Sequence, residues 1–226
     1  MVMLRGLALG ACLGVFAVSG LAVAEEETKL YDTGPAVVSG YVRFVNAAQA
    51  DVAITAGSSG ALALGTGMPG RIGRFQAVPA RQELTATLAV AGKTAAVSVT
   101  LLPDEFITIA ILDDAASLVL RDQPQDFNAL KADIAFFNAD PGCTGGVMRA
   151  GAKKTVVFSA VAPGQLARRS VNPVAALVEA GCDEAAVAGT LDLGLLEAGQ
   201  RYSVVVIPDG AGGHTLIGGQ DERARY

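Results

Sequence analysis

From Tyr41 onward the chain alternates short apolar runs with Gly, Pro and Asn, and few segments keep a helical period over three turns. Such runs, bounded by turn residues, are typical of β-strands. In the first part of the chain we expect strands at 41–46, 51–56, 61–65, 72–77, 84–90, 95–101, 105–112 and 116–121. In the second part we expect them at 133–138, 147–150, 154–160, 166–170, 174–179, 185–191, 201–207 and 214–218. Short, closely spaced strands favour β-sandwiches or small barrels over an α/β sheet.

A repeated segment divides this pattern into two units. The six residues at 42–47 (VRFVNA) return 92 positions later at 134–139 (IAFFNA), each copy reading as a buried strand closed by a turn. A second pair, 106–113 and 202–209, lies 96 positions apart and implies a net insertion of four residues. The repeat therefore predicts a duplicated β-unit.

The predicted fold class is all-β, with two tandem β-sandwich-like domains that follow a cleaved signal peptide. The expected divisions are a signal peptide at 1–24, a lead at 25–40, the first domain at 41–122, a linker at 123–131, the second domain at 132–219 and a frayed polar tail at 220–226.

The N-terminal 24 residues have the features of an export signal. Arg5 supplies the positive charge, residues 7–18 form a short apolar run, and Ala22-Val23-Ala24 fits a cleavage site. An uncleaved membrane anchor and a lipoprotein anchored at Cys12 are the alternatives. Cleavage would place a mature chain without a transmembrane helix in the periplasm.

The charge of the mature chain argues against one class of partner, and its cysteine content argues against a zinc site. Without residues 1–24, the chain has 16 basic and 22 acidic residues and a formal charge of −6, which argues against a nucleic-acid partner. Cys143 and Cys182 remain, and in an oxidising compartment we expect them to form a disulfide, although two separate thiols are the alternative. Two cysteines and one histidine are too few for a convincing zinc site.

Candidate catalytic groups are scarce. His214 is the only histidine, and its Gly-rich surroundings predict a solvated hairpin residue rather than a general base. Asp113 and Asp114 read as a solvated turn, and residues 65–70 as a flexible loop rather than a phosphate-binding one. We therefore predict no catalytic residues, no metal and no cofactor.

Basic residues concentrate in the middle of both units, in intervals that contain no acidic residue. They are Arg71, Arg74 and Arg81 in the first unit, and Arg149, Lys153, Lys154, Arg168 and Arg169 in the second. One interpretation is a positive surface for an anionic polymer or an acidic protein partner. The other is ordinary solubilising charge.

Two segments resemble the AlgF family of alginate biosynthesis proteins. The first comprises Leu30-Tyr31, Pro35, Ser39 and the strand at 41–47, and the second Val171-Asn172-Pro173-Val174 with the β-run near Tyr202. The resemblance spans the mature chain and is most specific at residues 30–47 and around Asn172-Pro173. The two cysteines do not belong to the family pattern.

The resemblance implies a two-domain periplasmic accessory protein of alginate O-acetylation that is not itself a transferase. Its expected role is an adaptor that links SGNH-type acetyltransferases and a membrane-bound acyltransferase. The family provides no catalytic residues to carry over. Two alternatives remain: an acidic-polysaccharide-binding module that uses the basic surfaces, and a transferase that carries acetyl on Ser, Thr or His.

Overall fold

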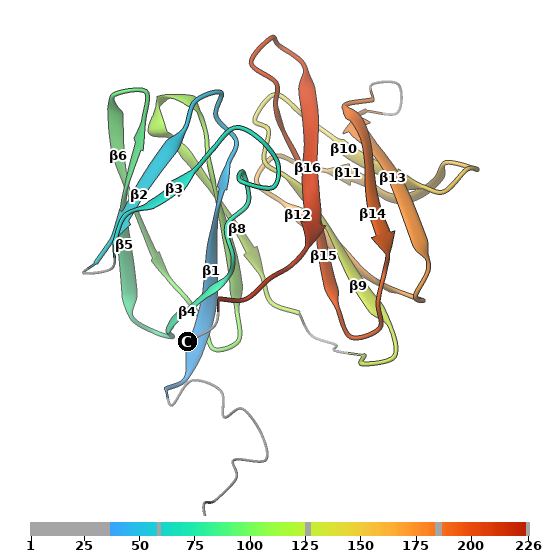
Figure 1. Ribbon diagram of the computed structural model, residues 1–226, viewed down its shortest axis with the longest axis horizontal. Helices are drawn as coiled ribbons and strands as arrows, with labels where there is room; N and C mark the ends of the chain where they lie inside the picture. The colour runs from blue at the N-terminus through green and yellow to red at the C-terminus, as the bar shows by residue number, and fades with distance from the viewer. Residues whose placement is uncertain (1–36, 58–59, 125–127, 184–186, 225–226) are drawn as a thin grey trace, which may run out of the picture. The chain divides into compact units, whose positions relative to one another are not determined.

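The computed structural model describes residues 37–57, 60–124, 128–183 and 187–224, and these residues form β-strands and one short 3₁₀ turn (Figure 1). The predicted signal peptide, Leu30, Tyr31 and Pro35 of the lead, and parts of the predicted linker and tail lie outside the described residues. The all-β fold class is confirmed, because the strands form four sheets arranged as sandwich-like domains.

Strands β1 to β8 form the first half. They are β1 (Ser39–Asn46), β2 (Val52–Ala56), β3 (Leu62–Leu64), β4 (Gln76–Pro79), β5 (Glu83–Val90), β6 (Lys93–Thr100), β7 (Phe106–Ile111) and β8 (Ser117–Asp122), with the 3₁₀ turn η1 (Asp113–Ala115) before β8. Strands β9 to β16 form the second half. They are β9 (Ala132–Asn138), β10 (Gly146–Ala150), β11 (Thr155–Val161), β12 (Leu166–Val171), β13 (Ala175–Cys182), β14 (Gly189–Leu195), β15 (Arg201–Pro208) and β16 (His214–Gln220).

The two halves have the same topology. The first contains sheets in the orders β4-β1-β7-β8 and β3-β2-β5-β6, and the second contains sheets in the orders β12-β9-β15-β16 and β11-β10-β13-β14. Each strand of the first half thus has a counterpart eight strands later. Both halves fall within one compact unit of the chain, and the exact domain boundaries stay a prediction.

Two of the expected strands are displaced along the sequence. β4 begins at Gln76 rather than at residue 72, because Ile72 and Phe75 form isolated bridges with Val45 and Arg223 instead of joining that strand. β14 spans Gly189–Leu195 and ends four residues beyond the predicted end at 191, and the start of the predicted strand lies outside the described residues.

The two late strands that repeat are offset from the sequence match by one residue. In each half the first strand pairs in parallel with the late strand, with Val42 opposite Ile107 and Ile134 opposite Tyr202. Ile107 and Tyr202 are therefore equivalent and lie 95 positions apart, against 92 for Val42 and Ile134, so the net insertion is three residues rather than four. A one-residue shift matters because it exchanges the two faces of a strand.

The repeated hexapeptide is strongly apolar because it forms a central strand that is covered on both faces. In β1, Val42 and Phe44 belong to the core of the first sandwich, whereas Val45 belongs to a separate cluster. Phe137 of β9 lies in that same cluster, which therefore joins residues of the two halves. Strands buried on both faces carry continuous apolar runs rather than alternating ones.

The conserved pattern of the two copies also includes an asparagine that closes each strand. Asn46 Nδ2 donates to the carbonyl oxygens of Ala50 (2.9 Å) and Gly65 (3.0 Å), and its Oδ1 accepts from Ala48 N–H (2.9 Å). Asn46 is fully buried, so these bonds satisfy backbone groups that the turn leaves without strand partners.

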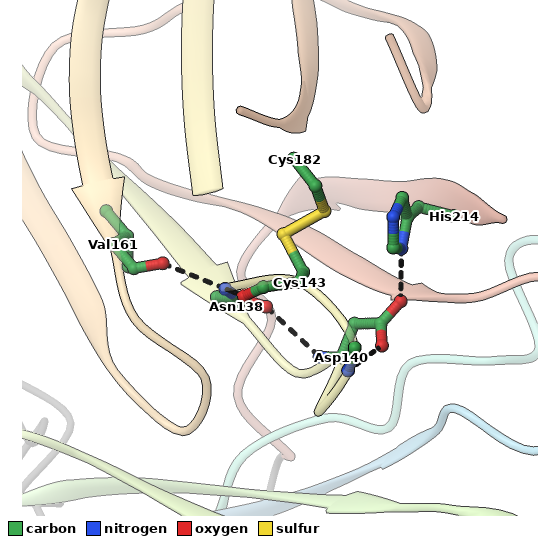
Figure 2. The surroundings of a disulfide bond; sticks show 7 residues. Asn138, Asp140, Cys143, Val161, Cys182 and His214 are labelled. Carbon is green, nitrogen blue, oxygen red and sulfur yellow. Dashed lines mark hydrogen bonds and ion pairs between the residues drawn. A yellow bond between two sulfur atoms is a disulfide. The ribbon is translucent and has the colours of Figure 1, made fainter. Parts of the chain in front are cut away.

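Asn138 repeats this arrangement in the second half. Its Nδ2 donates to the carbonyl oxygens of Cys143 (2.7 Å) and Val161 (2.8 Å), and its Oδ1 accepts from Asp140 N–H (3.2 Å), as Figure 2 shows. The Asn-Ala pair of the repeat is thus explained by a buried side chain that holds the following turn.

The disulfide between Cys143 and Cys182 is confirmed (Figure 2). It joins the loop after β9 to the end of β13, and both cysteines lie in the core of the second half. Closing a loop with a sequence separation of 39 residues stabilises the fold by about 4 kcal/mol on the chain-entropy model. The first half has no counterpart of this bond among its described residues.

We predict that Asn138→Ala lowers the free energy of unfolding by about 2–4 kcal/mol, because it leaves buried backbone groups without a hydrogen-bond partner. Urea denaturation measures the change. Asn128→Ala is the matched control, since Asn128 is exposed and its Oδ1 accepts a single bond from Leu130 N–H. Equal losses in the two variants would contradict the anchoring role of Asn138.

Candidate functional site

Arg43 is the central residue of the joint between the two halves. It extends from β1 on the face opposite its own sandwich core, and it is 2% exposed. Its Nε donates to Thr108 Oγ1 in the first half (3.0 Å), and its Nη2 donates to Ser203 Oγ in the second half (2.8 Å). The guanidinium also lies over the rings of Phe75 (4.4 Å) and Phe137 (5.4 Å). A single side chain thus binds to both halves.

The charge of Arg43 is neutralised by Asp221, which follows β16. Arg43 Nη1 donates to Asp221 Oδ1 at 2.7 Å, and the Asp221 side chain is 8% exposed. Ser203 Oγ donates to the same carboxylate oxygen (2.7 Å), which completes a buried network across the joint. Removing one partner of such a pair leaves a buried charge without compensation, and this is strongly destabilising.

A second charged cluster lies at the joint. Arg168 of β12 pairs with Asp122 of the first half and with Asp133 of its own half, and Arg201 of β15 lies close to both carboxylates. Burial alone would lower the pKa of Arg168, but its hydrogen bonds and attraction to the two carboxylates raise it above the ordinary value. Arg168 therefore contributes to the joint rather than to the polyanion surface that the sequence suggested.

The C-terminal residues add a third connection, and here the expectation of a frayed tail is wrong for residues 221–224. Phe75 N–H donates to Glu222 O (2.9 Å), and Ala224 N–H donates to Phe75 O (2.8 Å), so that the tail pairs with the first half. Arg74 also forms an exposed ion pair with Glu222. The tail of the second half is held because its backbone groups find strand-like partners on the first half.

The predicted basic residues of the first half have different roles. Arg71 is buried and donates to the carbonyl oxygens of Thr66, Asn46 and Ala48, and its pKa is lowered chiefly by burial. It therefore holds a loop and cannot present charge to a polymer. Arg74 is exposed but paired with Glu222, and Arg81 lies exposed in the turn before β5.

Three predicted basic residues of the second half lie on or beside the sheet β11-β10-β13-β14. Arg149 lies on β10 opposite Glu179 of β13, Lys153 is exposed in the turn between β10 and β11, and Lys154 pairs with Glu179. Arg169 is exposed on β12, in the other sheet. The predicted basic set is thus distributed over several elements, and two of its members are internal.

The outward face of the sheet β11-β10-β13-β14 carries exposed apolar side chains as well as charged ones. Val156 of β11 is 49% exposed and lies opposite Arg149, and Leu177 of β13 is 55% exposed. Leu195 of β14 is also exposed and lies opposite Ala175. Exposed apolar groups gathered on one face are typical of protein–protein interaction sites.

The corresponding face of the first half has a different chemistry. On the outward side of β5 and β6, Thr85 lies opposite Ser98, with their hydroxyl oxygens 2.8 Å apart, and Thr87 lies opposite Ala96. Thr55 of β2 lies beside Thr87. This face offers small hydroxyl and methyl groups, so the two halves present different surfaces despite their shared topology.

His214 is not the solvated residue that the sequence suggested. It begins β16, and its Nδ1 lies 2.5 Å from Oδ2 of Asp140, whose side chain is 5% exposed (Figure 2). Asp140 also accepts from Gly142 N–H (2.7 Å), beside the disulfide loop. This contact holds the β15–β16 hairpin against the loop that carries Cys143.

The other candidate groups also have local structural roles. Asp113 in η1 accepts from Gln49 N–H (3.0 Å), and Asp114 pairs with Lys93. Asp209 accepts from Ala211 N–H and Gly213 N–H, and these bonds lower its pKa. Over the part of the chain that the structure describes, no group of three or more His, Cys, Asp and Glu side chains could hold a metal ion.

The residues that matter most at the joint, namely Arg43, Asp221 and Arg201, were not predicted from the sequence. One signal for Arg43 was available, because an arginine occurs in a strand whose second copy has Ala135 at that position. No comparable sequence signal marks Asp221 or Arg201, since their partners are distant in the chain.

Comparisons with known proteins assign no family. No protein-family model and no curated protein matches the chain. Two similar solved structures are a family CBM26 module of Eubacterium rectale Amy13K in complex with maltoheptaose and a putative cell adhesion protein of Bacteroides ovatus. Identities are 8% and 9%, coverage is 82% and 83% of this chain and 98% of each of those chains, and TM-scores are 0.27 and 0.24. These values are too low to transfer a function. Within the described residues, no helix is long and apolar enough to span a membrane.

We predict that Arg43→Met lowers the free energy of unfolding by about 3–5 kcal/mol, because Asp221 is left as an unpaired buried charge. Urea denaturation measures the loss. Arg74→Met is the matched control, since it removes an exposed pair and should cost no more than about 1 kcal/mol.

The double variant Arg43→Met, Asp221→Asn should recover part of the stability, because no unpaired charge remains. A double variant that is less stable than the sum of the single losses, or an Arg43→Met variant no less stable than its control, would contradict the proposed role of the joint.

Proposed function

We propose that this chain is a non-catalytic periplasmic scaffold that supports O-acetylation of an alginate-like exopolysaccharide. It would act by linking SGNH-type acetyltransferases with a membrane-bound acyltransferase. The observation that carries this proposal is the presence of two chemically different outer sheets on halves that are joined by a buried network. A linking protein needs separate surfaces for separate partners, and a joint that keeps both on one unit.

The position of the resemblance to the AlgF family supports the proposal. The described part of its first segment includes β1 (Ser39–Asn46), and this strand supplies Tyr41, Arg43 and Val45 to the joint. The segment by which the chain resembles an accessory protein is thus the one that connects the two sandwiches. Such a pattern fits a protein whose role requires both halves together.

The second outer sheet is suited to a protein partner. Val156 and Leu177 supply apolar area that is lost from water when a partner binds, and Arg149 and Lys153 lie around them. Interfaces commonly combine an apolar centre with a polar rim. The first outer sheet, with its Thr and Ser side chains, would accept a flatter and more polar surface.

We predict that Leu177→Asp abolishes co-purification of one acetyltransferase component from periplasmic extract and reduces polymer acetylation about tenfold, because a charge replaces an apolar contact. Leu130→Asp is the matched control, since Leu130 is 81% exposed but lies in the loop before β9. Thr87→Arg tests the first outer sheet in the same way, with the exposed Thr66→Arg as its control.

Two results would oppose the scaffold role. One is normal acetylation in a strain that lacks the protein. The other is unchanged co-purification and acetylation in both outer-sheet variants, provided that their thermal melting matches that of the wild type.

The catalytic alternative has a direct test. We predict that intact-mass spectrometry detects no acetyl adduct after incubation with an acetyl donor, because His214 is engaged with Asp140 and forms part of a structural contact. An adduct at a single Ser, Thr or His, lost when that residue is replaced, would instead establish an acetyl-carrying enzyme.

A further inference from the structure

β6 is a long strand at the edge of the first outer sheet, β3-β2-β5-β6 (Figure 1). Its eight residues, Lys93–Thr100, pair one to one with Glu83–Val90 of β5, without a register shift. The other side of β6 pairs with no described strand. An edge of this kind presents a row of backbone N–H and C=O groups on which another strand can pair.

The hairpin that joins β5 to β6 determines which backbone groups of β6 point away from β5. Both of its central residues, Ala91 and Gly92, have positive φ angles, 47° and 82°, as in a type I′ turn. The pair that flanks such a turn is hydrogen-bonded, and hydrogen-bonded pairs then alternate with open ones along the ladder. The N–H and C=O groups of Thr94, Ala96 and Ser98 therefore point outward.

These outward groups are open over the middle of β6. Thr94, Ala96 and Ser98 are exposed, and their outward backbone groups have no hydrogen-bond partner among the described residues. The next outward carbonyl oxygen, that of Thr100, accepts from Nη1 and Nη2 of Arg121 at 3.3 Å. The open part of the edge thus lies between the β5–β6 turn and Arg121.

The other edge strands have features that weaken or block such pairing. β3 has three residues, and β4 has four and ends at Pro79. β11 and β14 have register shifts against their neighbours, and β16 contains two adjacent glycines. β8 and β12 are bridged by the ion pair of Asp122 with Arg168. Short length, proline, bulges and charges protect sheet edges, and residues 94–99 of β6 have none of these features.

The sequence of β6 is complementary to itself. An antiparallel pairing with a two-fold axis at Val97 joins the outward backbone groups of Ala96 in one copy to those of Ser98 in the other. On the buried face, Val97 then lies opposite Val97 of the second copy, and Ala95 lies opposite Val99. Small side chains meet on the exposed face. Apolar residues thus face apolar residues, and small residues face small ones.

Charge also favours this register. Moving the axis by one residue would place Val99 opposite Lys93 of the second copy, so apolar matching selects the axis at Val97. The charges at the two ends of β6 are neutralised within the chain, because Lys93 pairs with Asp114 and Arg121 pairs with Glu105. A second copy can therefore approach without an unpaired like charge.

We infer that two copies of this chain associate edge to edge through β6, so that two four-stranded sheets become one continuous antiparallel sheet. The contact is isologous, because the same residues of each copy form it. One strand from each copy buries little surface, and interfaces below about 1,200 Å² belong to weak complexes, so the dimer is reversible. The inference depends on the edge alone and is independent of the scaffold role.

The test is sedimentation equilibrium of the purified mature chain at about 10 μM to 1 mM. We expect a reversible equilibrium between monomer and dimer. Hydrogen exchange at the backbone amides of Ala96 and Ser98 should slow as the protein concentration rises, because these N–H groups become paired in the dimer.

A proline variant tests the edge directly. Ala96→Pro removes an outward N–H group and no bond to β5, and we expect it to lower the association constant about tenfold or more. Thr87→Arg is the matched control, since Thr87 lies opposite Ala96 on the same face but on the inner strand β5. A dimer formed by stacked outer faces would be lost in Thr87→Arg, whereas the edge-paired dimer persists.

A charge exchange keeps the inference testable if thermal melting shows that the proline variant loses its fold. Ala96→Lys, Ser98→Lys and Ala96→Glu, Ser98→Glu should each be monomeric, because positions 96 and 98 of the two copies lie opposite each other and like charges repel. Mixing the two double variants should restore association as a heterodimer.

Four outcomes would overturn the inference: a monomer at every concentration, an unchanged dimer in a folded Ala96→Pro variant, loss of the dimer in Thr87→Arg, or no heterodimer on mixing. A dimer that is lost only in Leu177→Asp would likewise place the contact on the other outer sheet. Each of these results would leave the scaffold proposal standing, because co-purification and acetylation test that proposal separately.

Discussion

The structure depends on the buried contact of Arg43 with Asp221 and Ser203. An arginine cannot remain buried in an apolar joint without an acceptor for its charge, and this acceptor comes from the far end of the chain. The residues that follow Asp221 are held beside the first half as well, through the backbone bonds of Glu222 and Ala224 with Phe75. The contact therefore couples the folding of the second half to its packing on the first.

The two halves share one framework and differ in local features. The parallel pairing of the first and late strands and the asparagine after the first strand are common to both. The differences are local: Arg43 has Ala135 as its counterpart, the disulfide occurs in the second half, and the outer sheets differ in chemistry. The asparagines that close the first strand serve the same purpose in both halves, because a buried backbone group needs a partner in either copy.

The joint also determines which charges remain available for function. Arg168 was expected on a positive surface, but it neutralises Asp122 and Asp133 at the joint, and Arg71 holds a loop. Lys153 and Lys154 remain exposed beside apolar side chains of the outer sheet β11-β10-β13-β14, whereas Arg74, Arg81 and Arg169 are exposed on other elements. Function in this chain is therefore best sought on its outer sheets and at its joint, rather than on one positive surface formed by the predicted basic residues.

The all-β class, the duplicated pattern of strands and the pairing of the two cysteines could be predicted from the sequence. Strands such as β5 and β15 were predictable because alternation and continuous apolar runs are local signals, and Cys143 and Cys182 were the only pair outside the expected signal peptide. The partner of Arg43, the burial of Arg168 and the contact of His214 with Asp140 could not be predicted in this way. These depend on residues up to 178 positions apart, and the side chains that meet at such distances are chosen by how sheets pack, which no local pattern encodes.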